Sequence, residues 1–96
     1  MADVAITSAA ERDFTDSLCW YAERSQRAAE GFEAEFDRTL ASIGADPQRF
    51  PHCDQRHRFC LMRRYPFQVI YREQADQVVI VAVAHAKREP GYWSNR

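Results

Sequence analysis

The sequence contains little cysteine, no long apolar run and no basic leader, and each absence argues against a class of protein. Its three cysteines, Cys19, Cys53 and Cys60, are an odd and small number, which argues against a disulfide framework and suits a reducing compartment. No apolar stretch reaches the ~18–20 residues of a membrane span, and the N-terminus lacks the basic start and apolar core of a secretory signal. We therefore expect a cytoplasmic protein that does not associate with a membrane.

Repeats, low-complexity tracts and inter-domain linkers are also missing. The 96 residues are enough for one modest core, so we expect a single domain over residues 1–96. The spacing Cys53-x3-His57-x2-Cys60 is loosely zinc-like, but it matches no regular finger or ribbon. We expect no metal and no cofactor.

Charge is unevenly distributed along the chain, although the net charge is only −1. Residues 1–48 carry ten acidic and four basic side chains, which gives −6, and residues 49–96 carry four acidic and nine basic side chains, which gives +5. Such asymmetry indicates two different partner surfaces. The basic half suits a phosphate or an acidic protein segment. The alternative is a solvated acidic helical face and ion pairs between the two halves.

Two amphipathic helices are predicted in the first half. A short β-like run at residues 4–7 precedes Ser8, which fits a capping box with Glu11. Ser25 is placed to cap the second helix, and Gly44 is placed to end it. The short break at Ser25 predicts an antiparallel helical hairpin. Apolar residues recur at helical spacing in both segments, at Ala10, Phe14, Leu18, Tyr21 and Ala22 and then at Ala28, Phe32, Phe36, Leu40 and Ile43.

Three strands are predicted in the second half, at Arg58–Tyr65, Phe67–Arg72 and Val78–His85, with a turn at residues 73–77. The last strand is apolar at most positions, so we expect it in the centre of the sheet. The order β-α-α-β-β-β predicts an α+β domain in which the helical hairpin packs on a small, mainly antiparallel sheet. The hairpin is the only available cover for the sheet, and we expect the first short strand at or near an edge.

The last twelve residues carry most of the candidate functional side chains. The apolar run Val78 to Ala84 stops at His85, and cations and large rings follow it. Binding and catalytic groups concentrate in loops and at strand ends, so we expect a site here. The candidates are His85, Lys87, Arg88, Tyr92, Trp93 and Arg96, together with Arg63 and Arg64.

Four motifs stand in order along nearly the whole chain: Ala10-x-x-Asp13, Asp46-Pro47-x-x-Phe50-Pro51, Arg63-Arg64-Tyr65-Pro66-Phe67-x-Val69-Ile70-Tyr71, and His85-Ala86-Lys87-Arg88-Glu89-Pro90-Gly91-Tyr92-Trp93. In this ordered set, the chain resembles the RelE/ParE toxins of bacterial type II toxin–antitoxin systems, the plasmid stabilisation protein family. The resemblance implies the same helix-hairpin-on-sheet fold. It also implies a growth inhibitor that a cognate antitoxin neutralises in a hetero-oligomeric complex.

The resemblance covers toxins with two different targets. ParE-like members poison DNA gyrase, and RelE-like members cut messenger RNA on the ribosome. The RNA-cleaving members carry lysines where this chain has Cys60 and Met62, and an arginine where it has Gln68. Because these cations are missing, we favour a ParE-like gyrase poison. The alternatives are a RelE-like, metal-independent endoribonuclease and an inactive toxin-like module that only binds an antitoxin.

Metal-free RNA cleavage would need a base, an acid and a cation on the phosphate. The catalytic candidates are His85, Tyr92 and Arg88, since arginine bonds two phosphate oxygens and histidine is the residue type most often used as an acid or base near neutral pH. Each has a simpler interpretation. His85 would be a strand-end histidine bonded to a backbone carbonyl, and Tyr92 and Trp93 would pack the tail across the sheet edge instead of stacking on bases.

A second surface is predicted beside the first helical stripe, at Trp20 and Tyr21. If one of these rings is exposed, it forms part of an apolar groove for a partner helix or strand. We therefore assign Trp20 and Tyr21, with Arg63, Arg64, Lys87, Trp93 and Arg96, to target or antitoxin binding.

Overall fold

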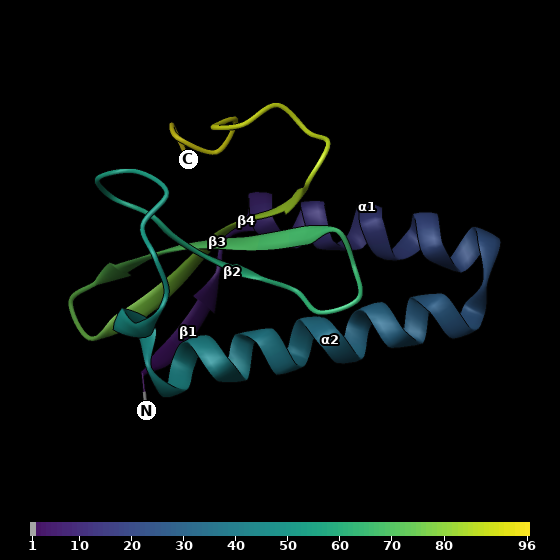
Figure 1. The fold of residues 1–96 in the computed structure, drawn as a ribbon, viewed down its shortest axis with the longest axis horizontal. Coiled ribbons are helices and arrows are strands. Elements are labelled where there is room, and N and C mark those ends of the chain that lie inside the picture. The colour runs from purple at the N-terminus through teal and green to yellow at the C-terminus, as the bar shows by residue number, and fades with distance from the viewer. Residues whose placement is uncertain (1) are drawn as a thin grey trace.

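In the computed structural model, which describes residues 2–96, the chain forms four strands, two α-helices and one short 3-10 helix (Figure 1). Their order confirms the predicted β-α-α-β-β-β sequence and the α+β class. Neither helix in the described part of the chain is long and apolar enough to cross a membrane. The elements are β1 Asp3–Ile6, α1 Ser8–Arg24, α2 Gln26–Ala45, η1 Pro47–Arg49, β2 Arg58–Leu61, β3 Phe67–Gln74 and β4 Gln77–His85.

The helical hairpin is capped by hydroxyl side chains, one residue earlier than predicted in α1. Thr7, not Ser8, caps α1: its backbone is extended, and its hydroxyl accepts the N–H of Ala10 at 3.1 Å. Ser25 has the predicted role, since its hydroxyl accepts the N–H of Ala28 at 3.1 Å. Its own N–H donates to Tyr21 O at 2.7 Å. One extended residue therefore ends α1 and begins α2, which makes the two helices antiparallel.

Gly44 does not end α2 as predicted. The helix continues through Ala45, and Asp46 follows as its C-cap. Gly44 is buried where α2 passes β1, and a Cβ there would lie 3.3 Å from a methyl carbon of Val4. The glycine therefore serves close packing between helix and strand.

The sheet has the strand order β1-β4-β3-β2. β1 lies at an edge, as expected, and pairs with β4 in parallel, whereas the other two pairings are antiparallel. β2 is shorter than predicted, because the chain leaves the sheet after Leu61 in a loop where Arg64 has a φ of 69°. β3 is longer than predicted and reaches Gln74, so the turn before β4 narrows to residues 75–76.

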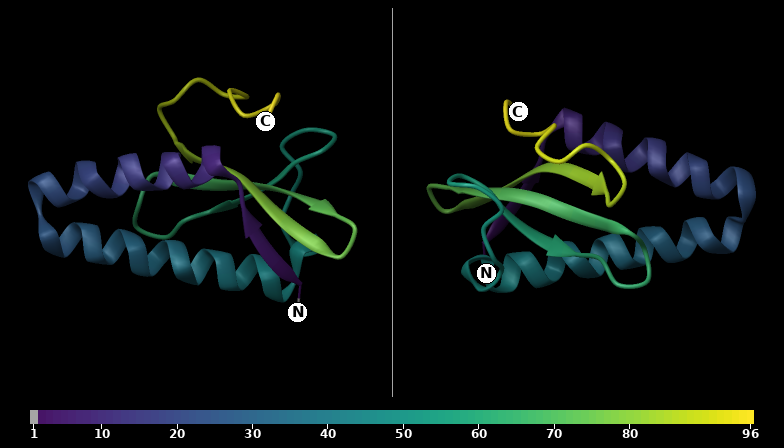
Figure 2. Two further views of the ribbon diagram at one scale, coloured as in Figure 1. Left: turned by 180° about the vertical axis from the view of Figure 1, so that it is seen from behind. Right: turned by 45° about the horizontal axis from the view of Figure 1, so that its top comes forward.

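Both faces of the sheet are covered, which corrects the expectation that the hairpin is its only cover. The helices pack on one face, where Phe32 and Phe36 meet Tyr71 and Ile80. On the other face, Trp93 packs with a layer formed by Ile70, Val79, Val81, Ala82 and Ala84. The right-hand view of Figure 2 shows the C-terminal segment crossing the sheet on the side away from α2. Two covered faces explain why β4 is apolar at nearly every position.

Candidate partner-binding groove and the C-terminal anchor

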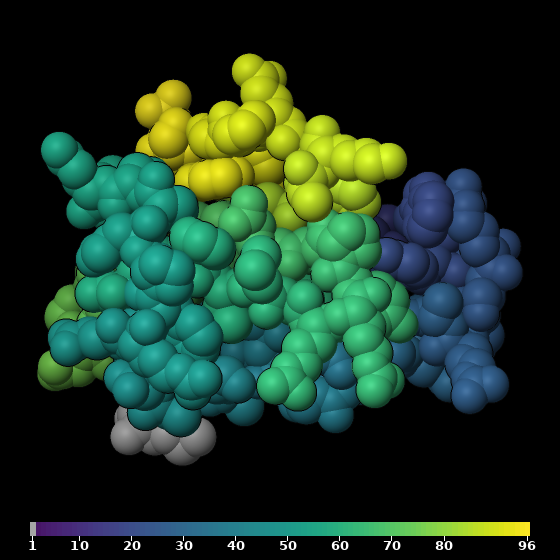
Figure 3. Space-filling model, viewed as in Figure 1, coloured from purple at the N-terminus to yellow at the C-terminus, as the bar shows by residue number. Residues whose placement is uncertain are grey.

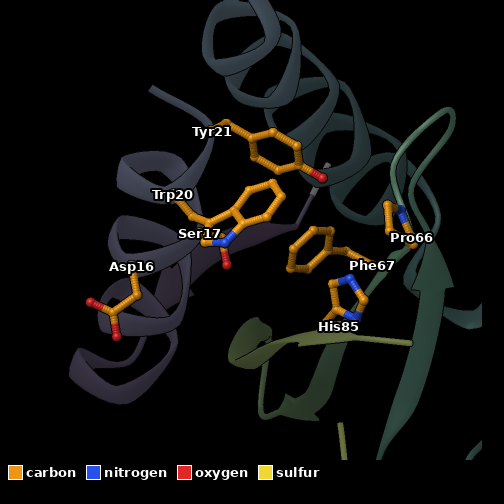
Figure 4. Close-up of a pocket in the computed structure, with 7 residues that line it drawn as sticks. All are labelled: Asp16, Ser17, Trp20, Tyr21, Pro66, Phe67 and His85. Carbon is orange, nitrogen blue, oxygen red and sulfur yellow. The ribbon is translucent and has the colours of Figure 1, made fainter. Parts of the chain in front are cut away.

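An apolar groove of about 510 Å³ lies between α1 and the ends of β3 and β4. Its walls are Asp16, Ser17, Trp20, Tyr21, Pro66, Phe67 and His85. Figure 4 shows the rings of α1 facing Phe67 and His85 across the opening. The Trp20 ring is 52% exposed and meets the Tyr21 ring edge-on, with 5.1 Å between centroids. The predicted exposed aromatic side chain beside the helical stripe is therefore present.

Tyr65 holds one wall of this groove against the hairpin. Its hydroxyl donates to Ala28 O at 2.9 Å, and its ring meets Tyr21 edge-on at 5.3 Å. The hydroxyl approaches α2 at Gly31, where a Cβ would collide with it. Because Pro66 and Phe67 follow Tyr65 directly, this contact places the wall that they form.

His85 lines the groove beside Phe67, with its ring edge-on to that of Phe67 at 4.9 Å between centroids. Its Nδ1 lies 3.0 Å from the backbone N–H of Lys87, which is always a donor. Nδ1 must therefore accept, and the neutral ring carries its proton on Nε2. The expected bond from His85 to a backbone carbonyl is replaced by acceptance of a backbone N–H.

Asp13 of α1 is the polar centre beside the groove, and its side chain is only 8% exposed. β1 pairs with β4 only as far as Ile80, so the β4 edge beyond it has no strand neighbour. The Asp13 carboxylate accepts the Val83 N–H at 3.1 Å and pairs with Arg96 at 2.7 Å. Arg96 also donates to Val81 O at 3.0 Å. Side chains thus satisfy a sheet edge that would otherwise be open.

Tyr92 belongs to the same anchor. Its hydroxyl donates to Asp13 at 3.1 Å. Burial, with the neighbouring negative charge of Asp13, raises the pKa of Tyr92 to about 12. The guanidinium carbon of Arg88 lies 3.8 Å from the centre of the Tyr92 ring. Arg88 lines a small cavity with Asp16, Ser17 and His85, three residues that also line the groove.

Trp93 is 6% exposed and packs in the apolar layer on the outer face of the sheet. Trp93 therefore packs the tail onto the sheet as in the simpler interpretation, but on its outer face and not across its edge, and its ring offers no free face for stacking on a base. Figure 3 shows the C-terminal segment, in yellow, packed closely against the green central part of the chain. Arg96, predicted to bind a partner, is instead committed to Asp13 and Val81 within the molecule.

The structure does not bring all the basic candidates together. Arg63 lines a separate groove between α2 and β2, with Arg38 and Arg49. Arg64 and Lys87 are exposed. Arg63 and Arg64 thus lie in the loop between β2 and β3, directly before Tyr65, whereas Lys87 and Arg88 follow His85 at the end of β4.

The residues with the loosely zinc-like spacing, Cys53, His57 and Cys60, do not form a common site. His57 is buried, and its Nδ1 bonds to Asp54 at 2.9 Å. Cys60 is buried in the core on the helix-covered face. Among residues 2–96, no group of three or more His, Cys, Asp or Glu side chains is placed to hold a metal ion.

Sequence reasoning missed Asp13 as a site residue, although it noted the residue in a motif. Asp13 lies three residues after the buried Ala10 and directly before Phe14, which packs against the core. A carboxylate within an apolar helical stripe requires buried partners. That rule identifies Asp13 as a residue with a specific role, but it does not identify partners 70 to 83 residues away.

The sequence model of the ParE toxin of the type II toxin–antitoxin system, parDE, matches residues 4–90. The chain belongs to the ParE toxin family. The solved chromosomal ParDE toxin–antitoxin system from P. aeruginosa is similar in structure, with a TM-score of 0.80 at 14% sequence identity. The match covers 91% of this chain and 98% of that chain, and at this identity it shows the fold alone. A comparison with curated proteins finds no match.

Within this ParE-family fold, the three catalytic candidates lie near one another, but each is already engaged. Neutral His85 offers an N–H instead of a lone pair, because its Nδ1 accepts from Lys87. The Tyr92 hydroxyl donates a hydrogen bond to Asp13, and the Arg88 guanidinium stacks on the Tyr92 ring. The arrangement presents a cation and an N–H donor beside an apolar groove, which suits binding of an amphipathic, acidic segment.

Proposed function

We propose that this chain is a growth-inhibiting toxin, held inactive by a cognate antitoxin, and that its target is DNA gyrase. On this proposal it acts in the cytoplasm and by binding, without cutting messenger RNA. The observation that carries the proposal is the hydrogen bonding of His85 and Tyr92. It leaves neither His85 nor Tyr92 free to act as a general base.

General base catalysis needs a lone pair within reach of the 2′-hydroxyl of the RNA. In neutral His85 the lone pair is on Nδ1, where it accepts the N–H of Lys87 at 3.0 Å. Tyr92 is no substitute, because burial and Asp13 raise its pKa to about 12, so the phenolate that could act as a base is scarce at neutral pH. These two observations favour binding over cleavage.

The positions of the missing lysines support the same conclusion. In RNA-cleaving relatives the resemblance places cations where this chain has Cys60 and Met62. Both side chains are buried in the core, with 8% and 6% exposure. A preorganised donor to the transition state contributes roughly 3–4 kcal/mol. No cation at these positions contributes here.

The antitoxin would occupy the groove beside Trp20. Trp20, Tyr21 and Phe67 provide apolar area. Arg88, which lines the adjoining small cavity, and the exposed Lys87 provide positive charge close to His85 in the chain. An amphipathic segment with an apolar face and an acidic flank matches both features. Neutralisation would follow if the same surface contacts the target.

Induced expression of this chain without its antitoxin tests the proposal, with growth, DNA integrity and protein synthesis measured in parallel. Gyrase poisoning predicts growth arrest with double-strand breaks while protein synthesis continues at first. Early loss of protein synthesis with intact DNA would overturn it in favour of RNA cleavage. Normal growth with well-folded protein would overturn the active-toxin reading and leave an antitoxin-binding module.

A further inference from the structure

Asp13 ties three parts of the chain together with one side chain. It accepts the N–H of Val83 in β4 at 3.1 Å and the hydroxyl of Tyr92 at 3.1 Å. It also pairs with both terminal nitrogens of Arg96, at 2.7 and 3.3 Å. Because the carboxylate is 8% exposed, solvent cannot replace these contacts without local opening.

The C-terminal segment depends on these contacts for its place. Ala86 N–H donates to Pro66 O and Arg88 N–H donates to His85 O, which fixes only the start of the segment. Beyond Arg88, the backbone hydrogen bonds of the segment are internal, from Ser94 to Gly91 and from Arg96 to Trp93. Trp93 packing, one bond from Arg72 to Arg96 O, and bonds from Arg96 and Tyr92 to carbonyls of β4 also hold the segment. Asp13 is the carboxylate that orients both Arg96 and Tyr92 for these bonds.

A contact chain leads from Asp13 to the groove. Asp13 holds the Tyr92 hydroxyl, and the Tyr92 ring carries the Arg88 guanidinium on its face at 3.8 Å. Arg88 lines the small cavity with Asp16 and His85 that adjoins the groove. In the described part of the chain, Arg88 forms no ion pair, whereas Asp13 is occupied by Arg96.

We infer that Asp13 is a positioning residue that, through Tyr92, holds Arg88 at the end of the groove to receive an acidic group of the antitoxin. This inference rests on the antitoxin-docking part of the proposed function. An unpaired arginine whose rotamer is restrained by an aromatic ring loses less entropy when it binds a carboxylate. Asp13 would thereby control partner affinity without touching the partner.

A double-mutant cycle on antitoxin affinity tests whether Asp13 acts through Arg88. The probe is the purified full-length antitoxin encoded beside this chain, titrated against wild type, Asp13→Asn, Arg88→Ala and the double variant. We expect each single variant to weaken binding by about tenfold. The double variant should also weaken binding by only about tenfold, because both substitutions remove the same interaction. A double variant weakened by about a hundredfold would show independent effects and overturn the inference.

A control separates loss of charge from loss of the anchor. Asp37→Asn makes the same chemical change at an exposed position of α2, and we expect it to leave the affinity within about twofold. An effect as large as that of Asp13→Asn would overturn the inference. If Asp13→Asn does not fold, Tyr92→Phe takes its place in the cycle, because it removes the hydroxyl and keeps the ring under Arg88.

A direct readout of the segment uses Trp93 fluorescence in a Trp20→Phe background without antitoxin. Asp13→Asn is expected to shift Trp93 emission to the red and to increase its quenching by acrylamide, with the helical content retained. An unchanged Trp93 signal would overturn the anchoring role. This readout needs no toxicity, so it distinguishes failure of the inference from failure of the proposed function.

Discussion

Gly31 of α2 and Tyr65 of the loop before β3 are in contact so close that a Cβ at Gly31 would collide with the Tyr65 hydroxyl. The same hydroxyl donates to Ala28 O, one turn earlier in α2. A glycine in a helix costs about 1 kcal/mol relative to alanine. Here that cost permits the loop to dock and places Pro66 and Phe67 at the groove.

The Gly31–Tyr65 contact predicts that one substitution has opposite effects in two backgrounds. In wild type, Gly31→Ala should lower the free energy of unfolding by about 1–2 kcal/mol, because the added methyl displaces Tyr65. In a Tyr65→Phe background the colliding oxygen is absent, and Gly31→Ala should instead raise it by about 1 kcal/mol. Urea unfolding of the four proteins measures both effects. Equal effects in the two backgrounds would show that contact with the Tyr65 hydroxyl is not the reason that position 31 requires a glycine.

The two tryptophans should differ sharply when truncated. Trp93→Ala removes a ring that is 6% exposed, and it should lower the free energy of unfolding by about 3–5 kcal/mol. Trp20→Ala removes a ring that is 52% exposed, and it should change stability by less than about 1 kcal/mol while weakening antitoxin binding at least tenfold. Thermal melts and antitoxin titrations separate the two. Unchanged antitoxin affinity in Trp20→Ala would show that the antitoxin does not bind in the groove.

Alkaline pH should destabilise the fold through two tyrosines. Burial raises the pKa of Tyr71 and of Tyr92 to about 12, above the ordinary value of 10. Between about pH 10 and 12 the unfolded chain loses these protons before the folded chain does, so stability falls as pH rises. Below pH 10 both states keep the protons and no loss is expected. Tyr92→Phe should remove part of the alkaline loss, as measured by chemical denaturation at each pH.

His85 offers a test of mechanism by substitution. His85→Gln removes the imidazole and keeps a side-chain donor and acceptor. Gyrase poisoning predicts that the His85→Gln protein is still toxic when it is expressed in cells without antitoxin. RNA cleavage that depends on His85 predicts a loss of roughly 10²–10⁴-fold in rate. Loss of growth arrest from a folded His85→Gln protein that still binds gyrase would therefore argue for cleavage.

Local features of this fold were predictable from the sequence, and distant contacts were not. Ser25 was identified as a cap because its partner Ala28 lies three residues away, and β4 was identified as central from its apolar run. Asp13 could not be linked to Arg96, because 83 residues separate them and no local pattern records the pairing. The same limit applies to Trp93: packing of the tail was an available interpretation, but the sequence did not show that the ring covers the outer face of the sheet and not its edge.

The central claim is that the chain binds gyrase and does not cut RNA. The most direct measurement incubates the purified chain with purified gyrase, ATP and supercoiled plasmid, and in parallel with translating ribosomes and messenger RNA. Antitoxin-bound chain is the control in both reactions. We expect the free chain to trap cleaved plasmid on gyrase and to leave messenger RNA intact. The antitoxin-bound chain should leave both the plasmid and the messenger RNA intact. Cleaved messenger RNA with gyrase unaffected would contradict the central claim.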